Sequence, residues 1–414
     1  MVGDKIMRKI LIITVNIVNN SPQPIRFRNL IKGWQDQNEI TVLTKDNVGT
    51  EEKLDKKIKI VKVPYSTLGK LLISYPLKKA NNNYYYFKKN KIKSFLRDIW
   101  KKANINRLIF PDKYIFEYKS FKKNIIKILR EEKFEVIIIS AYPFSLLKLA
   151  RPIKKYCHSE TKLVYDIGDP FYGNSIKFIM EPFHSILSKS YEKKYLKFID
   201  NLVVISNAVR KHYLEVFGSS LKNAEINVIE QGIVPYNTKK IIQENDTDKY
   251  TFIYAGGFYQ KLREPFELYK AFSQIDNLNI KLKIFGNIYK TFLPDISNEK
   301  FYYGGSITQK EVMHEFSNSD IIVFIDNAYG IQVPGKILEV ISVKKPILFI
   351  YENEDSPTFE FIKEYKGAVY SKNNSMSIKK AIFEIIERKD IFTYDYDLSM
   401  FYWENLASKY LNLF

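Results

Sequence analysis

Short continuous apolar runs alternate with polar, helix-like segments along most of the chain. The first run, Arg8 to Val15, is rich in β-branched residues, which is typical of a strand buried on both faces of a parallel sheet. A loop over Asn16 to Ile25, a helix over Arg26 to Gln35 and a strand over Glu39 to Leu43 follow, and this order predicts a βαβ unit. Further strands are predicted at Ile58 to Val63, Val136 to Ser140, Lys162 to Asp166 and Leu202 to Ser206, with helices at Lys122 to Glu132 and Ser190 to Phe198.

A polar, irregular segment from Gly232 to Lys249 is typical of an interdomain linker, and after it the alternation restarts. The pattern predicts strands at Tyr250 to Ala255, Leu282 to Phe285, Ile321 to Ile325 and Lys345 to Ile350, and helices at Pro265 to Phe272, Lys336 to Val343 and Met400 to Leu411. We therefore expect an α/β fold of two Rossmann-like domains that face a cleft. Residues 1–240 form the first domain, which the returning helix at 399–414 completes, and residues 241–398 form the second.

The composition, with 45% hydrophobic residues, is that of a globular protein. A chain of 414 residues is too long for one ordinary hydrophobic core, which agrees with two domains. Cys157 is the one cysteine, so no internal disulfide can form, and we expect a reducing, cytoplasmic compartment. The longest apolar runs are of strand length and far below the roughly 18 residues of a membrane span. The loop after the first strand lacks G-x-G-x-x-G, which argues against a dinucleotide fingerprint there.

The chain carries a formal net charge of +19, and this excess is concentrated. Residues 81–130 hold 14 Lys or Arg against 3 Asp or Glu, so this stretch alone contributes +11, and aromatic residues such as Tyr84 and Trp100 lie among the cations. Such a mixture suits an anionic membrane surface or a lipid diphosphate; a solvated lysine-rich face is the alternative. No RNA-recognition, KH or helix-turn-helix signature is present, so no nucleic acid is expected. We expect peripheral association with the inner face of the cell membrane.

The sequence GGFYQKLREP, from Gly256 to Pro265, follows a predicted strand and leads into a predicted helix. Glycines without Cβ let a phosphate approach the backbone, and Arg263 offers a planar fork of donors to a diphosphate. The alternative is an ordinary glycine-rich turn with a solvated arginine.

The sequence QVPGKILE, from Gln332 to Glu339, begins after a loop and enters the next helix. Pro334 and Gly335 fit the first helical positions, so free backbone N–H groups and the helix dipole would favour a diphosphate, with Lys336 adding a charge. Glu339 lies about one turn further on, where its oxygens could accept hydrogen bonds from ribose hydroxyls; a helix-surface role is the alternative.

Together these two segments resemble the C-terminal half of GT-B glycosyltransferases, especially the retaining family 4 type with its P-x-K-x-x-E segment. The resemblance extends to SAYPFS at 140–145, YDIGDPF at 165–171, DNLVVIS at 200–206, VIEQGI at 228–233 and FYWENLA at 401–407. It implies that Arg263 and Lys336 neutralise a nucleotide diphosphate, that Glu339 binds ribose and that Gly286 and Gly305 lie near the base.

The sequence departs from the family pattern at two places. Ile331 stands where the better-known pattern has its first Glu, so Gln332 and the backbone of Val333 are the candidates for donor-sugar contacts. Gly168 replaces the Arg of D-x-R-D-P-W. Asp169 is the candidate acidic group toward the donor sugar or acceptor hydroxyl, with a turn-forming role as the alternative. Arg26, Arg28 and Asp166 are candidate acceptor contacts, with a solvated helix start as the alternative for the two arginines.

The resemblance implies a glycosyltransferase that moves a sugar from a nucleotide diphosphate, most simply UDP, to a saccharide or lipid-linked acceptor in surface polysaccharide or glycoconjugate synthesis of a bacterial type. It implies retention of configuration, no metal and no cofactor beyond the nucleotide-sugar donor. The four histidines show no metal-ligand spacing. A nucleotide-sugar epimerase or a phosphorylase of the same fold, and a non-catalytic membrane-associated partner, are the alternative hypotheses.

Overall fold

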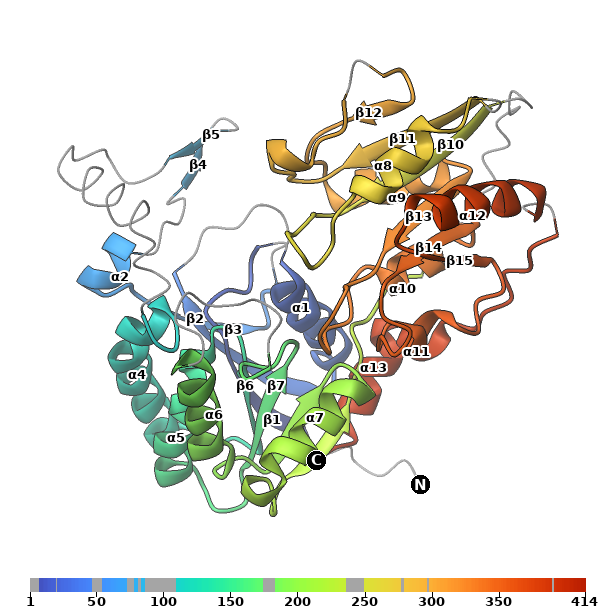
Figure 1. Ribbon diagram of the computed structural model, residues 1–414. Coiled ribbons are helices and arrows are strands. Elements are labelled where there is room, and N and C mark those ends of the chain that lie inside the picture. Colours follow the sequence, from blue (N-terminus) through green and yellow to red (C-terminus); the bar gives the residue numbers. More distant parts are fainter. Residues whose placement is uncertain are drawn as a thin grey trace. The chain divides into compact units, whose positions relative to one another are not determined.

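The computed structural model of the protein describes residues 7–19, 21–46, 54–72, 78–80, 83–85, 109–173, 183–235, 249–276, 279–295, 298–388 and 391–414. The chain divides into two compact units (Figure 1). Unit 1 comprises Met1–Gly232 and Trp403–Phe414, and unit 2 comprises Ile233–Tyr402. Each unit is built on one parallel β-sheet, so the predicted fold class is confirmed.

The sheet of unit 1 has seven strands in the order β3-β2-β1-β6-β7-β8-β9. Its central strands are apolar on both faces, as a sheet between two helical layers requires; Ile10 to Ile13 and Val136 to Ile139 are fully buried. The strands are β1 (Arg8–Ile13), β2 (Asn38–Lys45), β3 (Lys59–Val63), β6 (Val136–Ser140), β7 (Lys162–Ile167), β8 (Asn201–Val204) and β9 (Glu225–Val228). A separate antiparallel pair joins β4 (Lys78–Ala80) to β5 (Asn83–Tyr85).

Helices connect these strands, and the C-terminal helix packs on unit 1. Trp34 Nε1 donates a hydrogen bond to the carbonyl oxygen of Ala407 at 2.9 Å, and the Trp34 and Tyr410 rings meet edge to face. The predicted return of the last helix to the N-terminal domain is therefore confirmed. The helices of unit 1 are α1 (Pro22–Trp34), α2 (Thr67–Leu72), η2 (Lys113–Glu117), α4 (Tyr118–Glu131), η3 (Phe144–Leu149), α5 (Ala150–Tyr156), α6 (Phe183–Leu196), α7 (Asn207–Phe217), η4 (Gly218–Ser220) and α13 (Trp403–Leu411).

Unit 2 has a six-stranded sheet in the order β12-β11-β10-β13-β14-β15. The strands are β10 (Lys249–Ala255), β11 (Asn279–Phe285), β12 (Phe301–Tyr303), β13 (Ile321–Ile325), β14 (Ile347–Tyr351) and β15 (Ala368–Lys372). The helices are α8 (Phe266–Ser273), η5 (Lys290–Phe292), α9 (Gln309–Ser317), α10 (Ile337–Ser342), α11 (Phe359–Ile362), α12 (Ser375–Arg388) and η6 (Ser399–Phe401). One hydrophobic cluster covers each face of this sheet.

The strand order of unit 2 reverses direction between β10 and β13, which are direct neighbours in the sheet. Loops that leave adjacent strands at such a switch point diverge to opposite faces and leave room for a ligand at the carboxyl edge. The segments after β10 and β13 both carry polar residues, so this edge positions the candidate site.

Two helix starts differ from the predicted ones. Helix α1 begins at Pro22, not at Arg26, because proline is favoured in the first helical turn, where its missing N–H is not needed. Helix α10 begins at Ile337 with Lys336 as its N-cap residue. Pro334 and Gly335 therefore precede the helix, and the prediction that they occupy its first positions is wrong.

Candidate functional site

The turn after β10 holds Arg263 by backbone hydrogen bonds. Tyr259 and Arg263 exchange two N–H···O bonds of 2.9 and 2.8 Å, and Lys261 at the tip adopts a φ of 62°. The strained tip is supported by Glu264, whose Oε1 accepts from the Lys261 N–H at 2.7 Å. The sequence GGFYQKLREP thus folds into a short closed turn that fixes the position of the Arg263 side chain.

Asn327 links this turn to the segment after β13. Arg263 Nη2 donates to Asn327 Oδ1 at 2.6 Å, and Asn327 Nδ2 donates to the Gln332 carbonyl oxygen at 3.0 Å. The backbone adds a bond of 2.8 Å from the Ala328 N–H to the Leu262 carbonyl oxygen. One buried amide therefore joins the arginine of the first predicted segment to the beginning of the second.

Two buried polar atoms at this edge have no hydrogen-bond partner among the described residues: Arg263 Nε and Asp326 Oδ2. The other oxygen of Asp326 accepts from Thr358 Oγ1 at 2.7 Å and from the Asn327 N–H at 2.8 Å. Burial raises the pKa of Asp326, and the positive charge of Arg263 opposes that rise. Leaving a buried donor and a buried acceptor unpaired costs free energy, so these atoms indicate a place where a polar ligand would be stabilised.

Lys336 and Glu339 form the second charged part of the site. Lys336 Nζ donates to the carbonyl oxygen of Ala255, the last residue of β10, at 3.2 Å. Burial lowers the pKa of Lys336, and the nearby Arg263 charge lowers it further. Glu339 Oε1 accepts from Gln309 Nε2 at 2.8 Å, and burial raises the pKa of this carboxyl group. Two cations and one carboxylate are thus gathered around the end of β10.

The glycines differ in what their missing Cβ allows. Gly286 has a φ of 141°, and a Cβ there would collide with the Gly256 carbonyl oxygen, so only glycine fits between the ends of β10 and β11. Gly305, with a φ of 72°, accepts from the Gly286 N–H at 2.8 Å and faces open space. Beside Gly256 and Gly257 the space is filled by two tyrosine hydroxyls, those of Tyr254 and Tyr259.

The loop before α10 is held by packing as much as by polar contacts. Pro334 is buried and Val333 packs against a hydrophobic cluster of unit 2. Gln332 contributes its carbonyl oxygen to Asn327. The side-chain amide of Asn327 therefore links Gln332 to Arg263, and Lys336 lies at the end of β10.

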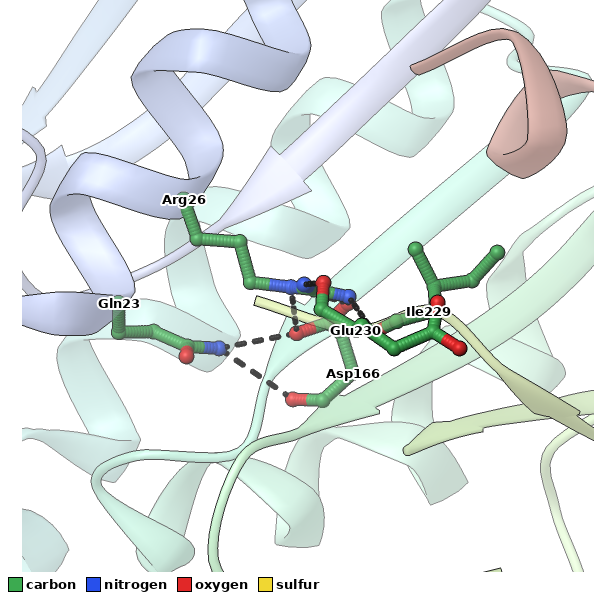
Figure 2. A network of polar contacts seen from close by, with 5 residues as sticks. All are labelled: Gln23, Arg26, Asp166, Ile229 and Glu230. Carbon is green, nitrogen blue, oxygen red and sulfur yellow. Dashed lines mark hydrogen bonds and ion pairs between the residues drawn. The ribbon is translucent and has the colours of Figure 1, made fainter. Parts of the chain in front are cut away.

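The predicted acceptor contacts Arg26, Arg28 and Asp166 belong to unit 1, and their side chains already make hydrogen bonds and an ion pair within it. The side chains of Arg26 and Asp166 are 0% exposed and form an ion pair at 3.0 Å (Figure 2). Arg26 also donates to the carbonyl oxygens of Ile229 and Glu230, at 3.0 and 2.6 Å. The prediction that these residues contact an acceptor is wrong for this arrangement, because every nitrogen of the Arg26 guanidinium already donates within unit 1.

Arg28 is also buried, and its Nη1 donates to the carbonyl oxygens of Ile17 and Asn19 at 3.0 and 2.6 Å. It ties the loop after β1 to α1, so neither an acceptor contact nor a solvated helix start describes it. Asp169 differs from these three residues: it is exposed in the turn that follows β7, at the carboxyl edge of the unit 1 sheet.

Half of the basic and aromatic stretch at 81–130 lies outside the described residues. Within the described part, Phe110 packs against Phe171, His184 and Tyr191 inside unit 1, so this ring is part of a cluster and not a surface aromatic. The helices of the described ranges include none long and apolar enough to cross a membrane.

Sequence reasoning missed the polar residues that organise the site: Asp326, Asn327, Thr358 and Gln309. The signal that could have found the first two is position, because both directly follow the buried strand β13 at the switch point. Thr358 and Gln309 reach the site from distant parts of unit 2, and no local pattern marks them.

No protein-family model matches the chain, and no curated protein matches its sequence. Solved structures do match over nearly the whole chain. Sucrose-phosphate synthase from Thermosynechococcus elongatus is 12% identical, with a TM-score of 0.63 and 98% of each chain covered. Anabaena Alr3699/HepE in complex with UDP and glucose is 10% identical, with a TM-score of 0.60 and 98% of this chain and 99% of that chain covered.

A third similar structure is that of an enzyme with another activity: UDP-GlcNAc 2-epimerase from Methanocaldococcus jannaschii is 13% identical, with a TM-score of 0.54 and 98% of this chain and 99% of that chain covered. At these identities the likeness establishes the fold. The chain has the GT-B fold that its sequence predicts, and its place in family 4 stays a prediction.

Proposed function

We propose that the protein is a glycosyltransferase whose unit 2 binds the diphosphate of a nucleotide sugar. The observation that carries this proposal is that two cations, Arg263 and Lys336, lie close together near the end of β10. Arg263 Nε is also buried and has no partner among the described residues. Burial lowers the pKa of Lys336, and the positive charge of Arg263 nearby lowers it further. A diphosphate supplies the negative charge and the acceptor oxygens that this cluster lacks.

In the proposed reaction the bond between the sugar C1 and the diphosphate oxygen breaks while a bond from an acceptor oxygen to C1 forms. The departing diphosphate gains charge and takes the acceptor proton. Arg263 and Lys336 stabilise that growing charge, and electrostatic stabilisation of this kind usually accelerates such a reaction more than any other effect of the protein. The carboxylate of Glu339 accepts hydrogen bonds from ribose hydroxyls. The hydrogen bonds that Arg263 donates to Asn327 and Lys336 donates to the Ala255 carbonyl oxygen hold the two cations in place before the reaction.

Finer features of the function are proposed on the resemblance in sequence. They are UDP as the nucleotide, retention of configuration, independence of metal, and a saccharide or lipid-linked acceptor. UDP is also the nucleotide named with the similar HepE structure. Gln332, Val333, Gly286 and Gly305 are proposed to line the donor, and Asp169, exposed after β7, remains the proposed acidic group of unit 1. Peripheral binding to a cytoplasmic membrane face is proposed on the charge of residues 81–130.

An epimerase acting on a nucleotide sugar is the second candidate, favoured by the likeness to the 2-epimerase structure. Both candidates need the same diphosphate contacts but differ in what leaves the site. A transferase forms a new glycosidic product only with an acceptor, whereas an epimerase converts the donor alone. Incubating the purified protein with UDP-sugars, with and without saccharide acceptors, and analysing products by mass spectrometry separates the two.

The diphosphate assignment is tested by UDP titration and turnover of Arg263→Ala against Arg388→Ala. Arg388 is the matched control because it pairs with Glu384 at the surface of α12. We expect Arg263→Ala to lower kcat/KM by about 10²–10³-fold, the usual effect of removing one group that stabilises transition-state charge. UDP affinity should fall with it, and Arg388→Ala should leave both unchanged. Wild-type UDP binding and turnover by Arg263→Ala would refute the assignment.

A further inference from the structure

Unit 1 contains a surface cavity of about 510 Å³ between the end of α6 and the segment that joins η4 to β9. This volume lies in the range of about 300–1,000 Å³ that is usual for small-molecule sites. The residues that matter here are four lysines and two neighbouring hydroxyls: Lys193, Lys194, Lys197, Lys222, Ser219 and Ser220. No Asp or Glu lines the cavity.

The cavity lies at the amino edge of the unit 1 sheet. Helix α6 ends at Leu196 and β8 begins at Asn201, so the connection between them runs at the edge where parallel strands start. The segment from η4 to β9 reaches the same edge, since β9 begins at Glu225 beside β8. Asp169 follows the carboxyl end of β7, and Arg263, Lys336 and Glu339 belong to unit 2. The cavity is thus built from different residues than the proposed donor site.

The four lysines of the cavity have no ion pair among the described residues, whereas nearby lysines of unit 1 do. Lys154 pairs with Asp200 at 2.6 Å and Lys211 with Glu215 at 3.9 Å. Lys193 and Lys197 are four residues apart at the end of α6, and like charges at this spacing repel one another. Lysines near a helix C-terminus complement the helix dipole. That effect concerns the three lysines at the end of α6, but Lys222 comes from the separate segment before β9.

A bound anion would relieve this repulsion. Ammonium groups bind phosphate as point charges, and serine hydroxyls can donate to its remaining oxygens. We propose that this cavity binds a phosphate group, carried either by a small phosphorylated molecule or by a lipid headgroup. The proposal does not rest on the proposed transfer reaction, because it uses none of the residues assigned to the donor.

The test compares two double variants of the full chain that remove the same charge. Lys193→Gln with Lys197→Gln alters the cavity, and Lys56→Gln with Lys57→Gln removes two exposed lysines from the turn before β3, outside the basic stretch at 81–130. Calorimetric titration with pyrophosphate should give a Kd about tenfold or more higher for the cavity variant than for wild type. The control variant should keep the wild-type Kd. Any pyrophosphate bound at the donor site is common to all three proteins.

A second arm identifies the source of the phosphate by cosedimentation with phosphatidylcholine vesicles that contain phosphatidic acid. Loss of vesicle binding confined to the cavity variant assigns a lipid headgroup, and loss of pyrophosphate binding alone assigns a free phosphorylated molecule. The proposal is overturned if wild type binds neither probe, if the cavity variant binds both as wild type does, or if both double variants lose binding equally. Melting temperatures of the three proteins check that the substitutions leave the fold intact.

Discussion

The carboxyl edges of the two sheets each carry an arginine near an acidic residue, but the two clusters differ in how fully they are satisfied. In unit 1 the Arg26 and Asp166 side chains are 0% exposed, and Gln23 Nε2 adds a hydrogen bond of 3.1 Å to the carboxylate (Figure 2). In unit 2 Arg263 is partly exposed, its Nη2 donates to Asn327, and its Nε has no hydrogen-bond partner among the described residues.

This difference separates a structural ion pair from a binding site. Burying a charge is tolerated only when partners replace its lost hydration. Arg26 has those partners within unit 1, which leaves it no capacity for a ligand. Arg263 and Lys336 lie close enough to raise one another's electrostatic cost, and Asp326, on which the charge of Arg263 acts, keeps one oxygen without a partner among the described residues. Both clusters combine an arginine with an aspartate near the end of a strand. Their roles are therefore assigned by whether the polar atoms of each cluster already have hydrogen-bond partners.

The largest expected effect is the loss of stability when Asp166→Ala breaks the buried ion pair of Arg26 and Asp166, the closed cluster of unit 1. The substitution leaves the Arg26 guanidinium buried without its carboxylate, and removing one partner of a buried pair costs about 3–5 kcal/mol. Asp36→Ala, at an exposed position in the turn after α1, is the matched control and should change the free energy of unfolding by no more than about 0.5 kcal/mol. Urea denaturation followed by circular dichroism measures both.

The same measurement on Arg263→Ala bears directly on the comparison. Because Arg263 is partly exposed and incompletely bonded, its removal should cost far less unfolding free energy than Asp166→Ala while it lowers the affinity for UDP. If Arg263→Ala proved as destabilising as Asp166→Ala, the distinction between a closed structural cluster and an open binding cluster would fail.

The sequence was a good guide to strands that are apolar throughout. Val136–Ser140 and Ile321–Ile325 were predicted with the bounds that the structure has, because burial on both faces leaves a continuous apolar run. Helix α1 was predicted to begin four residues late because Pro22 and Pro24 were interpreted as loop residues, although both lie in its first turn. Local signals thus locate an element more reliably than they locate its end.

The candidate site was only partly predictable. Arg263, Lys336 and Glu339 could be proposed because they belong to two short segments with recognisable spacing. Arg26 and Asp166 were misassigned because their pairing joins positions 140 residues apart, and nothing near either one indicates the other. Asp326 and Asn327 are marked by their position after β13, but the contacts that give them their importance come from Thr358 and Arg263, which lie far away in the sequence.

An intermediate effect is expected in the pH dependence of UDP binding. Glu339 must be ionised to accept from ribose, and burial raises its pKa, so affinity should be lost as the pH falls through a value above that of an ordinary carboxyl group. Lys336 must be protonated, and burial lowers its pKa, so affinity should also be lost as the pH rises through a value below that of an ordinary lysine. Titration of UDP at a series of pH values should therefore show a bell-shaped profile.

Two variants assign the limbs of that profile. Glu339→Gln cannot ionise and should remove the acidic limb, whereas Lys336→Arg stays charged and should extend the alkaline limb. Glu384→Gln, on the exposed pair with Arg388, is the control and should leave the profile unchanged. A profile that keeps its acidic limb in Glu339→Gln would remove Glu339 from ribose binding and leave Arg263 and Lys336 as the assigned contacts.

The smallest expected effect concerns Asn327, which makes the open cluster rigid without facing the ligand in its own right. Its amide accepts from Arg263 at 2.6 Å and donates to the Gln332 carbonyl oxygen at 3.0 Å. Asn327→Ala should weaken UDP binding about tenfold, which corresponds to about 1.4 kcal/mol for a lost buried hydrogen bond to a charged group. If Asn327 acts by positioning Arg263, then Asn327→Ala should have no further effect on UDP affinity in a chain that already carries Arg263→Ala. Additive losses in the double variant would instead mean that Asn327 contributes to binding independently of the arginine, and the amide would then count as a ligand contact.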